Sequence, residues 1–333
     1  MKTEKVKLPL CALALLLLIL DSRTSLRGAA EGVALCLATV IPSLFPFFVI
    51  SAWLTPAISG RSFPLLKSLG RMAGIPSGEE SLLLVGFLSG YPVGAERVAD
   101  AASRGRIRRE NAARMIVFCN NPGPSFLFGI TGGLFPRGWM VWALWGIQII
   151  SSLIYGTLTA EQLPRQSVCS SPERSGSSTI FPALRAMAGV CGWVIVFRVV
   201  LAFLDRWVFW LFPPFLSTAL SGVLELTNGC CGLGEIPEVG SRFLLCSGML
   251  AFGGLCVAMQ TASVTACVPF SRYLPGKLLQ TGISISLALC LQPLLPDSLP
   301  GALPLGVLLL LGCVLVIFAK NQKFSRFSVH AGV

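Results

Sequence analysis

The sequence predicts an all-α polytopic membrane protein with about eight transmembrane helices and two re-entrant hairpins, arranged as an inverted repeat. Three observations support this fold class. The 333 residues are 54% hydrophobic and 12% charged, with a mean hydropathy of +0.76, which is too apolar for a soluble domain. Apolar runs recur along the chain, and most approach the roughly 20 residues that cross a bilayer as a helix. The basic residues, finally, sort by side of the membrane.

We expect crossing helices at residues 9–26, 29–56, 112–134, 139–160, 186–212, 242–268, 278–294 and 302–319. With a cytoplasmic amino terminus, eight crossings return the carboxyl terminus to the cytoplasm. Twenty of the 26 Lys and Arg residues then lie in cytoplasmic loops, five lie in outer loops, and Arg198 lies within a helix. Because basic loops are retained in the cytoplasm, this distribution favours an integral membrane protein with both termini cytoplasmic.

The first apolar run follows three lysines and resembles a signal peptide. No small-residue cleavage site follows it, because Asp21 and Arg23 interrupt the chain and another apolar segment soon begins. We therefore expect a retained helix. The sequence divides into an N-terminal transmembrane helix (1–28), a first repeat (29–160), a polar cytoplasmic linker (161–185), a second, inverted repeat (186–295), and a C-terminal transmembrane helix with a basic tail (296–333).

Two short apolar stretches, 81–95 and 215–229, are broken by glycine or proline, and each contains Leu-Ser-Gly. The charge-based topology holds only if each stretch enters and leaves the membrane on one side. Each is preceded by a long apolar helix and followed by a second interrupted helix. The spacing from Gly90 to Gly123 is 33 residues, and that from Gly222 to Gly253 is 31. The two stretches open from opposite sides, so the repeats are inverted.

Inverted repeats with broken helices are a recurring design of secondary transporters, in which one half rocks against the other around a site at the membrane midplane. The alternative is a structural duplication without transport. Proline and glycine are the residues that interrupt such helices. We expect the breaks at Gly90, Pro92, Pro122, Gly123, Pro124, Gly222, Gly229, Gly253 and Gly254.

A substrate site requires polar groups that converge where the helices break, since interrupted backbone inside a membrane must find partners. The amino-terminal ends of broken helices also offer free N–H groups and a positive dipole end, which favour an anion. Four clusters satisfy this requirement. They are Ser89 and Tyr91; Asn120, Asn121 and Ser125; Glu225, Thr227 and Asn228; and Ser247, Gln260 and Thr261.

Arg198 and Glu225 are ionisable residues within apolar segments, which makes them functional candidates. Arg198 is suited to holding the carboxylate of an anionic substrate, and Glu225 to carrying a coupling proton or binding a cation. The alternatives are that the two residues pair with each other or that Arg198 reaches an interface. The identity of a coupling ion, proton or sodium, stays open.

Enzymatic activity is not expected. The only histidine is His330 in the carboxyl-terminal tail, the four aspartates form no paired motif, and Ser89 has no visible base. No metal site or cofactor is expected either. The expected partners are a small anionic solute and membrane lipids, with a homo-oligomer left open. Contact with anionic lipids, not nucleic acid, is the interpretation of a basic stretch formed by Arg104, Arg106, Arg108, Arg109 and Arg114.

Five motifs carry a family resemblance, at residues 42–47 (PSLFPF), 86–95 (GFLSGYPVGA), 118–124 (FCNNPGP), 225–229 (ELTNG) and 252–260 (FGGLCVAMQ). They resemble the YlbJ/SpoVV sporulation integral membrane protein family over about residues 30–290. That family contains the nucleoside-recognition Gate domain and is similar in organisation to concentrative nucleoside transporters.

The resemblance implies a transporter that moves dipicolinic acid from the mother cell across the outer forespore membrane during endospore formation. A planar pyridine dicarboxylate is compatible with broken-helix N-termini, amide side chains and Arg198. The sequence leaves two alternatives open. One is a nucleoside or other small-solute carrier coupled to sodium or protons, and the other is a structural sporulation membrane protein that transports nothing.

Overall fold

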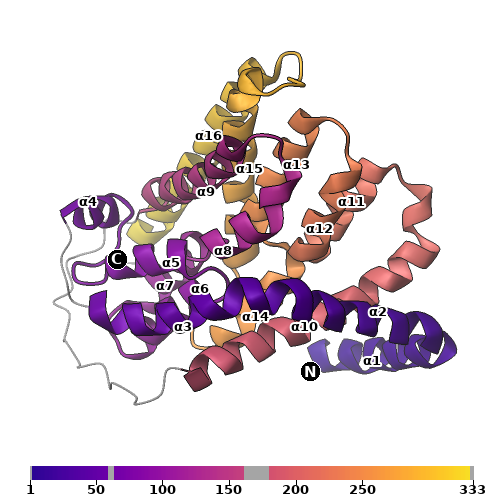
Figure 1. The fold of residues 1–333 in the computed structure, drawn as a ribbon. Coiled ribbons are helices and arrows are strands. Elements are labelled where there is room, and N and C mark those ends of the chain that lie inside the picture. Colours follow the sequence, from indigo (N-terminus) through magenta and orange to yellow (C-terminus); the bar gives the residue numbers. More distant parts are fainter. Residues whose placement is uncertain (1, 59–63, 161–179, 331–333) are drawn as a thin grey trace.

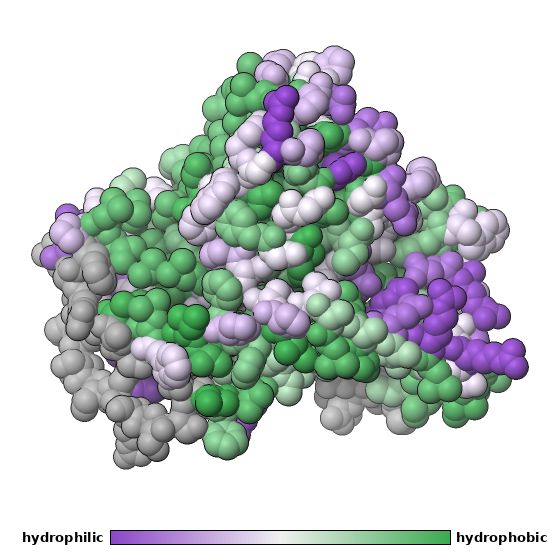
Figure 2. Space-filling view, in the orientation of Figure 1, coloured by the Kyte–Doolittle hydropathy of each residue, from purple (hydrophilic) through white to green (hydrophobic). Residues whose placement is uncertain are grey.

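The computed structural model describes residues 2–58, 64–160 and 180–330, and all regular elements within these ranges are helices (Figure 1). Figure 2 shows apolar residues over most of the visible face, with hydrophilic residues gathered at its upper and right-hand ends. The prediction of an all-helical integral membrane protein is confirmed. Among the described residues, five helices are long and apolar enough to cross a membrane, at Ser22–Leu54, Gly138–Leu158, Ala183–Trp207, Val239–Val264 and Tyr273–Leu294. The count of eight crossings stays a prediction.

The amino-terminal helices divide at a different residue from the one expected. Helix α1 (Lys2–Leu20) ends at Asp21, whose side chain accepts a hydrogen bond from the Thr24 amide at 3.3 Å and caps α2 (Ser22–Leu35). A π-helical turn, η1 (Cys36–Val40), then joins α2 to α3 (Ile41–Ile58) without interruption. The expected turn between residues 26 and 29 is therefore wrong.

Small residues near that expected turn serve helix packing instead. A Cβ atom added to Gly28 would lie 2.8 Å from Ala202 Cβ, and one added to Gly32 would lie 2.9 Å from Ile195 Cα. Both neighbours belong to α10 (Ile180–Trp207). Glycines four residues apart let α2 and α10 approach closely, as small residues do between membrane helices.

The rest of the first half contains a helical hairpin and an interrupted helix. Residues 161–179 of the expected linker lie outside the described ranges. The elements are α4 (Pro64–Met72), α5 (Ser81–Leu88), α6 (Val93–Ser103), α7 (Arg109–Phe118), α8 (Pro124–Phe126), η2 (Leu127–Thr131), η3 (Gly132–Leu134) and α9 (Gly138–Leu158).

The second half repeats this order after α10. Its hairpin is α11–α12 and its interrupted helix is α13–α14. The elements are η4 (Phe209–Leu211), α11 (Pro214–Leu224), α12 (Leu226–Gly232), η5 (Leu233–Glu235), α13 (Val239–Phe252), α14 (Gly254–Val264), α15 (Tyr273–Leu291), η6 (Gln292–Leu294) and α16 (Ala302–His330).

A reciprocal pair of hydrogen bonds relates the two halves where α9 crosses α15. Gln148 Nε2 donates to Ser284 Oγ at 3.1 Å, and Gln280 Nε2 donates to Ser152 Oγ at 2.8 Å. Rising residue numbers on α9 thus meet falling numbers on α15, so the two helices are antiparallel. Both carry Gln-x-x-x-Ser at an offset of 132 residues, which is also the offset between the two Leu-Ser-Gly motifs.

The packing of neighbouring helices follows the same relation. Helix α7 packs on α9 and α15, while α13 packs on α15 and α9. Helix α6 contacts α14, and η2, which continues α8, contacts α12. These contacts are the ones expected of two halves related by a pseudo-two-fold axis through the crossing of α9 and α15, where the two helices run in opposite directions. The direction of the axis relative to the membrane stays a prediction.

Two of the expected helix breaks are not breaks. Gly222 lies inside α11 and Gly229 lies inside α12. A Cβ atom on Gly229 would lie 2.3 Å from Gly222 Cα, so the two glycines let the arms of the hairpin approach backbone to backbone. The chain turns instead at Glu225, whose extended backbone (φ −143°, ψ 118°) separates α11 from α12.

Candidate solute-binding site

In the first half, the bend of the α5–α6 hairpin meets the break between α7 and α8. Gly90 has φ +78° at the bend, and Gly123 is extended at the break, directly before Pro124 in the first turn of α8. A Cβ atom on Gly90 would lie 3.0 Å from the Gly123 backbone nitrogen. Pro92 precedes the first residue of α6. The breaks expected at Gly90, Pro92 and the Pro122–Pro124 segment are therefore present.

The second half shows the same meeting of a hairpin and a broken helix. Helix α13 ends at Gly253 (φ +81°) and α14 begins at Gly254 (φ +82°), a left-handed conformation that glycine adopts without strain. A Cβ atom on Gly254 would lie 3.0 Å from Gly222 O and 3.3 Å from Leu224 O, both on the α11–α12 hairpin. The breaks expected at Gly253 and Gly254 are present.

These interrupted elements surround a small central cavity of about 30 Å³. Its polar lining comes from both halves: Tyr91 and Gly123 from the first, and Glu225, Thr227 and Gln260 from the second. Valine, leucine and phenylalanine side chains complete the wall. The volume is about that of one water molecule, so a larger ligand requires the surrounding helices to separate.

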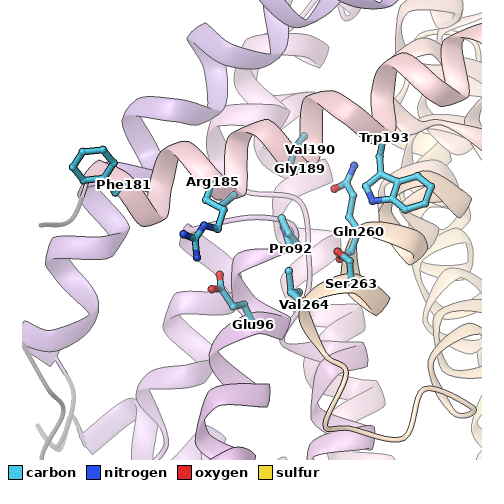
Figure 3. A pocket seen from close by; sticks show the side chains of 11 residues that line it. Pro92, Glu96, Phe181, Arg185, Gly189, Val190, Trp193, Gln260, Ser263 and Val264 are labelled. Atoms are coloured by element: carbon cyan, nitrogen blue, oxygen red, sulfur yellow. The ribbon is translucent and has the colours of Figure 1, made fainter. Parts of the chain in front are cut away.

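A larger pocket of about 380 Å³ lies between α6, α10 and α14, and Gln260 and Val190 line both it and the central cavity. Figure 3 shows Arg185 and Glu96 facing each other at one end of this pocket, and Trp193 beside Gln260 at the other. Its volume is within the range of sites for small organic ligands. The pocket therefore leads from the surface of the protein toward the central cavity.

Glu225 is almost fully buried and satisfies the amino-terminal end of α12. Its carboxylate accepts hydrogen bonds from the Thr227 amide at 3.0 Å, and from the Asn228 amide and Asn228 Nδ2 at 2.7 Å each. The Glu225 carboxylate thus binds the N–H groups that we expected to bind an anionic substrate. The expectation of a free helix end is wrong for this hairpin.

Arg198 lies away from this cavity, in a cluster of charges where α2 meets α10. Its guanidinium pairs with Glu31 on α2 and with Asp205, at 2.9 Å, on α10. It is not part of the lining of either pocket, and its carboxylate partners are not Glu225. The alternative that Arg198 pairs with Glu225 is therefore wrong, and none of the hydrogen bonds or ion pairs of the described residues connects Arg198 to the other candidate residues.

The two asparagines of the first break belong to a buried polar network behind the cavity. Asn121 Oδ1 accepts hydrogen bonds from Ser152 Oγ and Gln280 Nε2, both at 2.8 Å. Asn120 Nδ2 donates to Thr261 Oγ1 at 2.9 Å and to the Tyr273 hydroxyl at 3.0 Å. Asn120, Thr261 and Tyr273 link the first break to α14 and α15.

Lys277 is a basic member of this network that the sequence reasoning missed, as it missed Ser152, Gln280 and Tyr273. Its side chain is fully buried on α15, and its Nζ atom donates to Asn120 O at 2.6 Å and to Gln280 Oε1 at 3.0 Å. We assigned it to a cytoplasmic loop because the helix was expected to begin at residue 278, whereas α15 begins at Tyr273. The sequence did contain an indication that Lys277 belongs to the helix, since it lies next to a long apolar run.

Arg114 was also misassigned. It was grouped with the lipid-binding stretch, but its guanidinium is buried on α7 and donates to Ala73 O at 2.8 Å, Gly74 O at 3.0 Å and Gly156 O at 2.9 Å. It ties the turn after α4 to the end of α9. Contact with anionic lipids stays a prediction for the other arginines of the stretch.

The remaining candidates are buried but do not line the cavity. Ser89 lies at the end of α5, and Ser125 lies in α8 with its hydroxyl oxygen lacking a hydrogen-bond partner in the described structure. Ser247 Oγ pairs with Ser284 Oγ at 2.9 Å beside the α9–α15 crossing. Thus the structure gathers Tyr91, Glu225, Thr227 and Gln260 around one cavity and places the other candidates behind it or elsewhere.

Comparison with known proteins supports the resemblance drawn from the motifs. The chain is similar to the sporulation integral membrane protein YlbJ of Bacillus subtilis (strain 168), with 28% identity over 142 residues. The resemblance to YlbJ is confirmed. The match covers 41% of this chain and 33% of the length of YlbJ. No family model matches the chain, and no solved structure matches it.

Proposed function

We propose that this chain is a membrane transporter of a small anionic solute, with dipicolinic acid as the substrate, and that it works by alternating access. The observation that carries the proposal is the convergence of two hairpins and two broken helices, from halves related by a pseudo-two-fold axis, on one central cavity. Helices that are broken at a midplane site and related by such an axis are the working parts of many secondary transporters.

The pocket and the cavity form successive parts of one pathway in this proposal. The solute enters the larger pocket, where Arg185 supplies positive charge and the ring of Trp193 supplies an aromatic surface. It reaches the central cavity when the helices around Gln260, which lines both spaces, separate. The pocket is bounded by the amino-terminal end of α10, which follows a segment that the charge pattern assigns to the cytoplasm. The described state is then open toward the cytoplasm.

The substrate and the location rest on the resemblance to a sporulation membrane protein. Dipicolinate would be moved across the outer forespore membrane of sporulating cells, in a protein with both termini cytoplasmic. A second function is favoured by one observation. Glu225 lines the cavity and brings a negative charge there, which suits the hydroxyl groups of a nucleoside or a coupling cation better than an anion.

The test is uptake of labelled dipicolinate by proteoliposomes that contain the full chain. Saturable uptake that weakens at least tenfold in Gln260→Ala and Thr227→Val variants is the expected result, because both side chains line the cavity. Lys67→Ala is the matched control, since Lys67 is exposed on α4.

Competition separates the alternatives. Inhibition of uptake by nucleosides, or uptake of nucleosides in place of dipicolinate, would move the assignment to a nucleoside carrier. Folded protein that moves neither solute under sodium or proton gradients would indicate a structural sporulation protein.

A further inference from the structure

The first helix break is contacted by a buried amine, that of Lys277 on α15, which has no carboxylate partner among the described residues. Lys277 is fully buried, and within the described ranges none of the ion pairs includes it. Burying an unpaired ammonium inside a membrane protein is costly, and such groups are retained where they act. The partners of the Nζ atom therefore show what the charge does.

The partners are oxygen atoms at the end of an interrupted helix. Nζ lies 2.6 Å from Asn120 O, in the segment that follows the last residue of α7, and 3.0 Å from Gln280 Oε1. The carboxyl-terminal end of a helix carries unsatisfied carbonyl groups and the negative end of the helix dipole. A third contact is the ring of Tyr91, whose centroid lies 5.6 Å from Nζ, within the range of a cation–π interaction.

This environment is one that holds a small monovalent cation. Where membrane transporters bind sodium, unwound backbone carbonyls and half-helix carboxyl-terminal ends coordinate it. At the first break, a backbone oxygen of the same kind, Asn120 O, and an amide oxygen, Gln280 Oε1, contact the side-chain amine of Lys277. The second break has no such group at the equivalent position, because Trp145 on α9 lies 132 residues before Lys277 and glycines form that break.

We propose that the Lys277 ammonium takes the place of a bound sodium ion at the first break, so that this site stays cationic without an external ion. The charge reaches the candidate pathway through Tyr91. The ring of Tyr91 lines the central cavity, and its hydroxyl donates to Leu250 O at 2.6 Å in the interrupted helix of the other half. Lys277 thereby holds the α7–α8 break, the first hairpin and α13 in one arrangement.

The test compares the thermal unfolding of the purified full chain in sodium chloride, methylammonium chloride and choline chloride at equal ionic strength. The wild-type midpoint should be equal in all three salts. Lys277→Ala should unfold at a lower temperature in choline, and sodium or methylammonium, which fit the vacated space, should raise its midpoint by about 3 °C more than choline does. Lys67→Ala is the control and should behave as the wild type.

Two results of the salt comparison would overturn the proposal. One is a wild-type protein that sodium stabilises specifically, and the other is a Lys277→Ala variant that gains no more from sodium or methylammonium than from choline. If Lys277→Ala does not fold, Lys277→Met decides, because it keeps most of the side-chain length without the charge. A Met variant as stable as the wild type would equally exclude a cationic role.

The consequence for transport rests on the proposed function and is measured separately. Uptake of labelled dipicolinate by the wild type should be the same in sodium and choline, and uptake by Lys277→Ala should fall at least tenfold in choline and recover in sodium or methylammonium. The unfolding experiment contains no solute. A chain that transports no dipicolinate but shows the cation-specific shift would therefore refute the substrate and leave the cation site standing.

Discussion

The two hairpins occupy matching positions in the two halves, but they are held in place differently. The first packs backbone on backbone against the α7–α8 break: a Cβ atom on Gly86 would lie 2.3 Å from Cys119 O, and one on Gly94 would lie 1.9 Å from it. The second packs more loosely on backbone, since a Cβ atom on Gly254 would lie 3.0 Å from Gly222 O, and its closest contact is the side chain of Met249, 2.6 Å from a Cβ atom on Gly222. At the positions 132 residues after Gly86 and Gly94, the second hairpin has Thr218 and Leu226.

The difference indicates which hairpin moves more easily. A carbonyl enclosed by two glycines cannot shift without moving the backbone of the interrupted helix. Methionine has an unbranched, adaptable side chain that repacks when its neighbours move. We infer that the first hairpin and the first broken helix behave as one body, and that alternating access separates the second hairpin from α13.

The largest expected effect tests the rigid contact. Gly94→Ala places a methyl group on the Cys119 carbonyl, and since backbone cannot yield, we expect the unfolding free energy to fall by about 3 kcal/mol. Gly222→Ala should cost only about 1 kcal/mol, because the flexible end of Met249 gives way. Gly146→Ala, with no atom within 4 Å of the new Cβ, is the control.

The measurement is the thermal unfolding midpoint of each purified variant in the same detergent. Equal losses for Gly94→Ala and Gly222→Ala would show that the two hairpins are held equally tightly. That result would contradict the inference that the second hairpin moves more easily than the first.

The next effect concerns the glutamines at the α9–α15 crossing. Gln280 hydrogen-bonds to Ser152, Asn121 and Lys277, whereas Gln148 bonds to Ser284 and to the Ser247 carbonyl. With about 0.6–1 kcal/mol for each bond, Gln280→Ala should cost about 2 kcal/mol and Gln148→Ala about 1 kcal/mol. The two substitutions remove the same atoms, so thermal unfolding compares their networks directly.

The double variant serves as an internal check. The side-chain amides of Gln148 and Gln280 share no hydrogen-bond partner, so the losses of the two substitutions should add. A loss for Gln148→Ala as large as that for Gln280→Ala would mean that the network around Lys277 contributes nothing beyond the pseudo-symmetric pair.

The sequence predicts where helices are interrupted better than it predicts which polar contacts form at the interruptions. Pro122, Gly123 and Pro124 exclude a regular helix from backbone geometry alone, so that break is readable without a structure. The predicted breaks at Gly222 and Gly229 were wrong because glycine both ends helices and permits close packing, and the sequence does not distinguish these two roles. Only the distance between the two backbones separates the cases.

The polar network shows a second limit of sequence reasoning. Asn121 and Gln280 are 159 residues apart, and Asn120 and Lys277 are 157 apart, so their contacts follow from the crossing of the two halves. The charge-based topology also counted Lys277 and Arg114 as cytoplasmic, since it assumes that lysine and arginine side chains lie in water. Lys277 and Arg114 are exceptions, because backbone carbonyls of neighbouring helices satisfy them in the interior.

The smallest expected effect concerns Arg198, which, like Lys277, is a basic residue within an apolar segment. Arg198 has two carboxylate partners, Glu31 and Asp205, and both are partly exposed. Pairs of this kind contribute little, so Arg198→Gln should lower the unfolding free energy by less than about 1 kcal/mol and leave the KM for dipicolinate unchanged. Unfolding and uptake measured on the same preparation test both statements. A tenfold rise in KM at unchanged stability would return Arg198 to the solute pathway and show that α10 turns toward the cavity during transport.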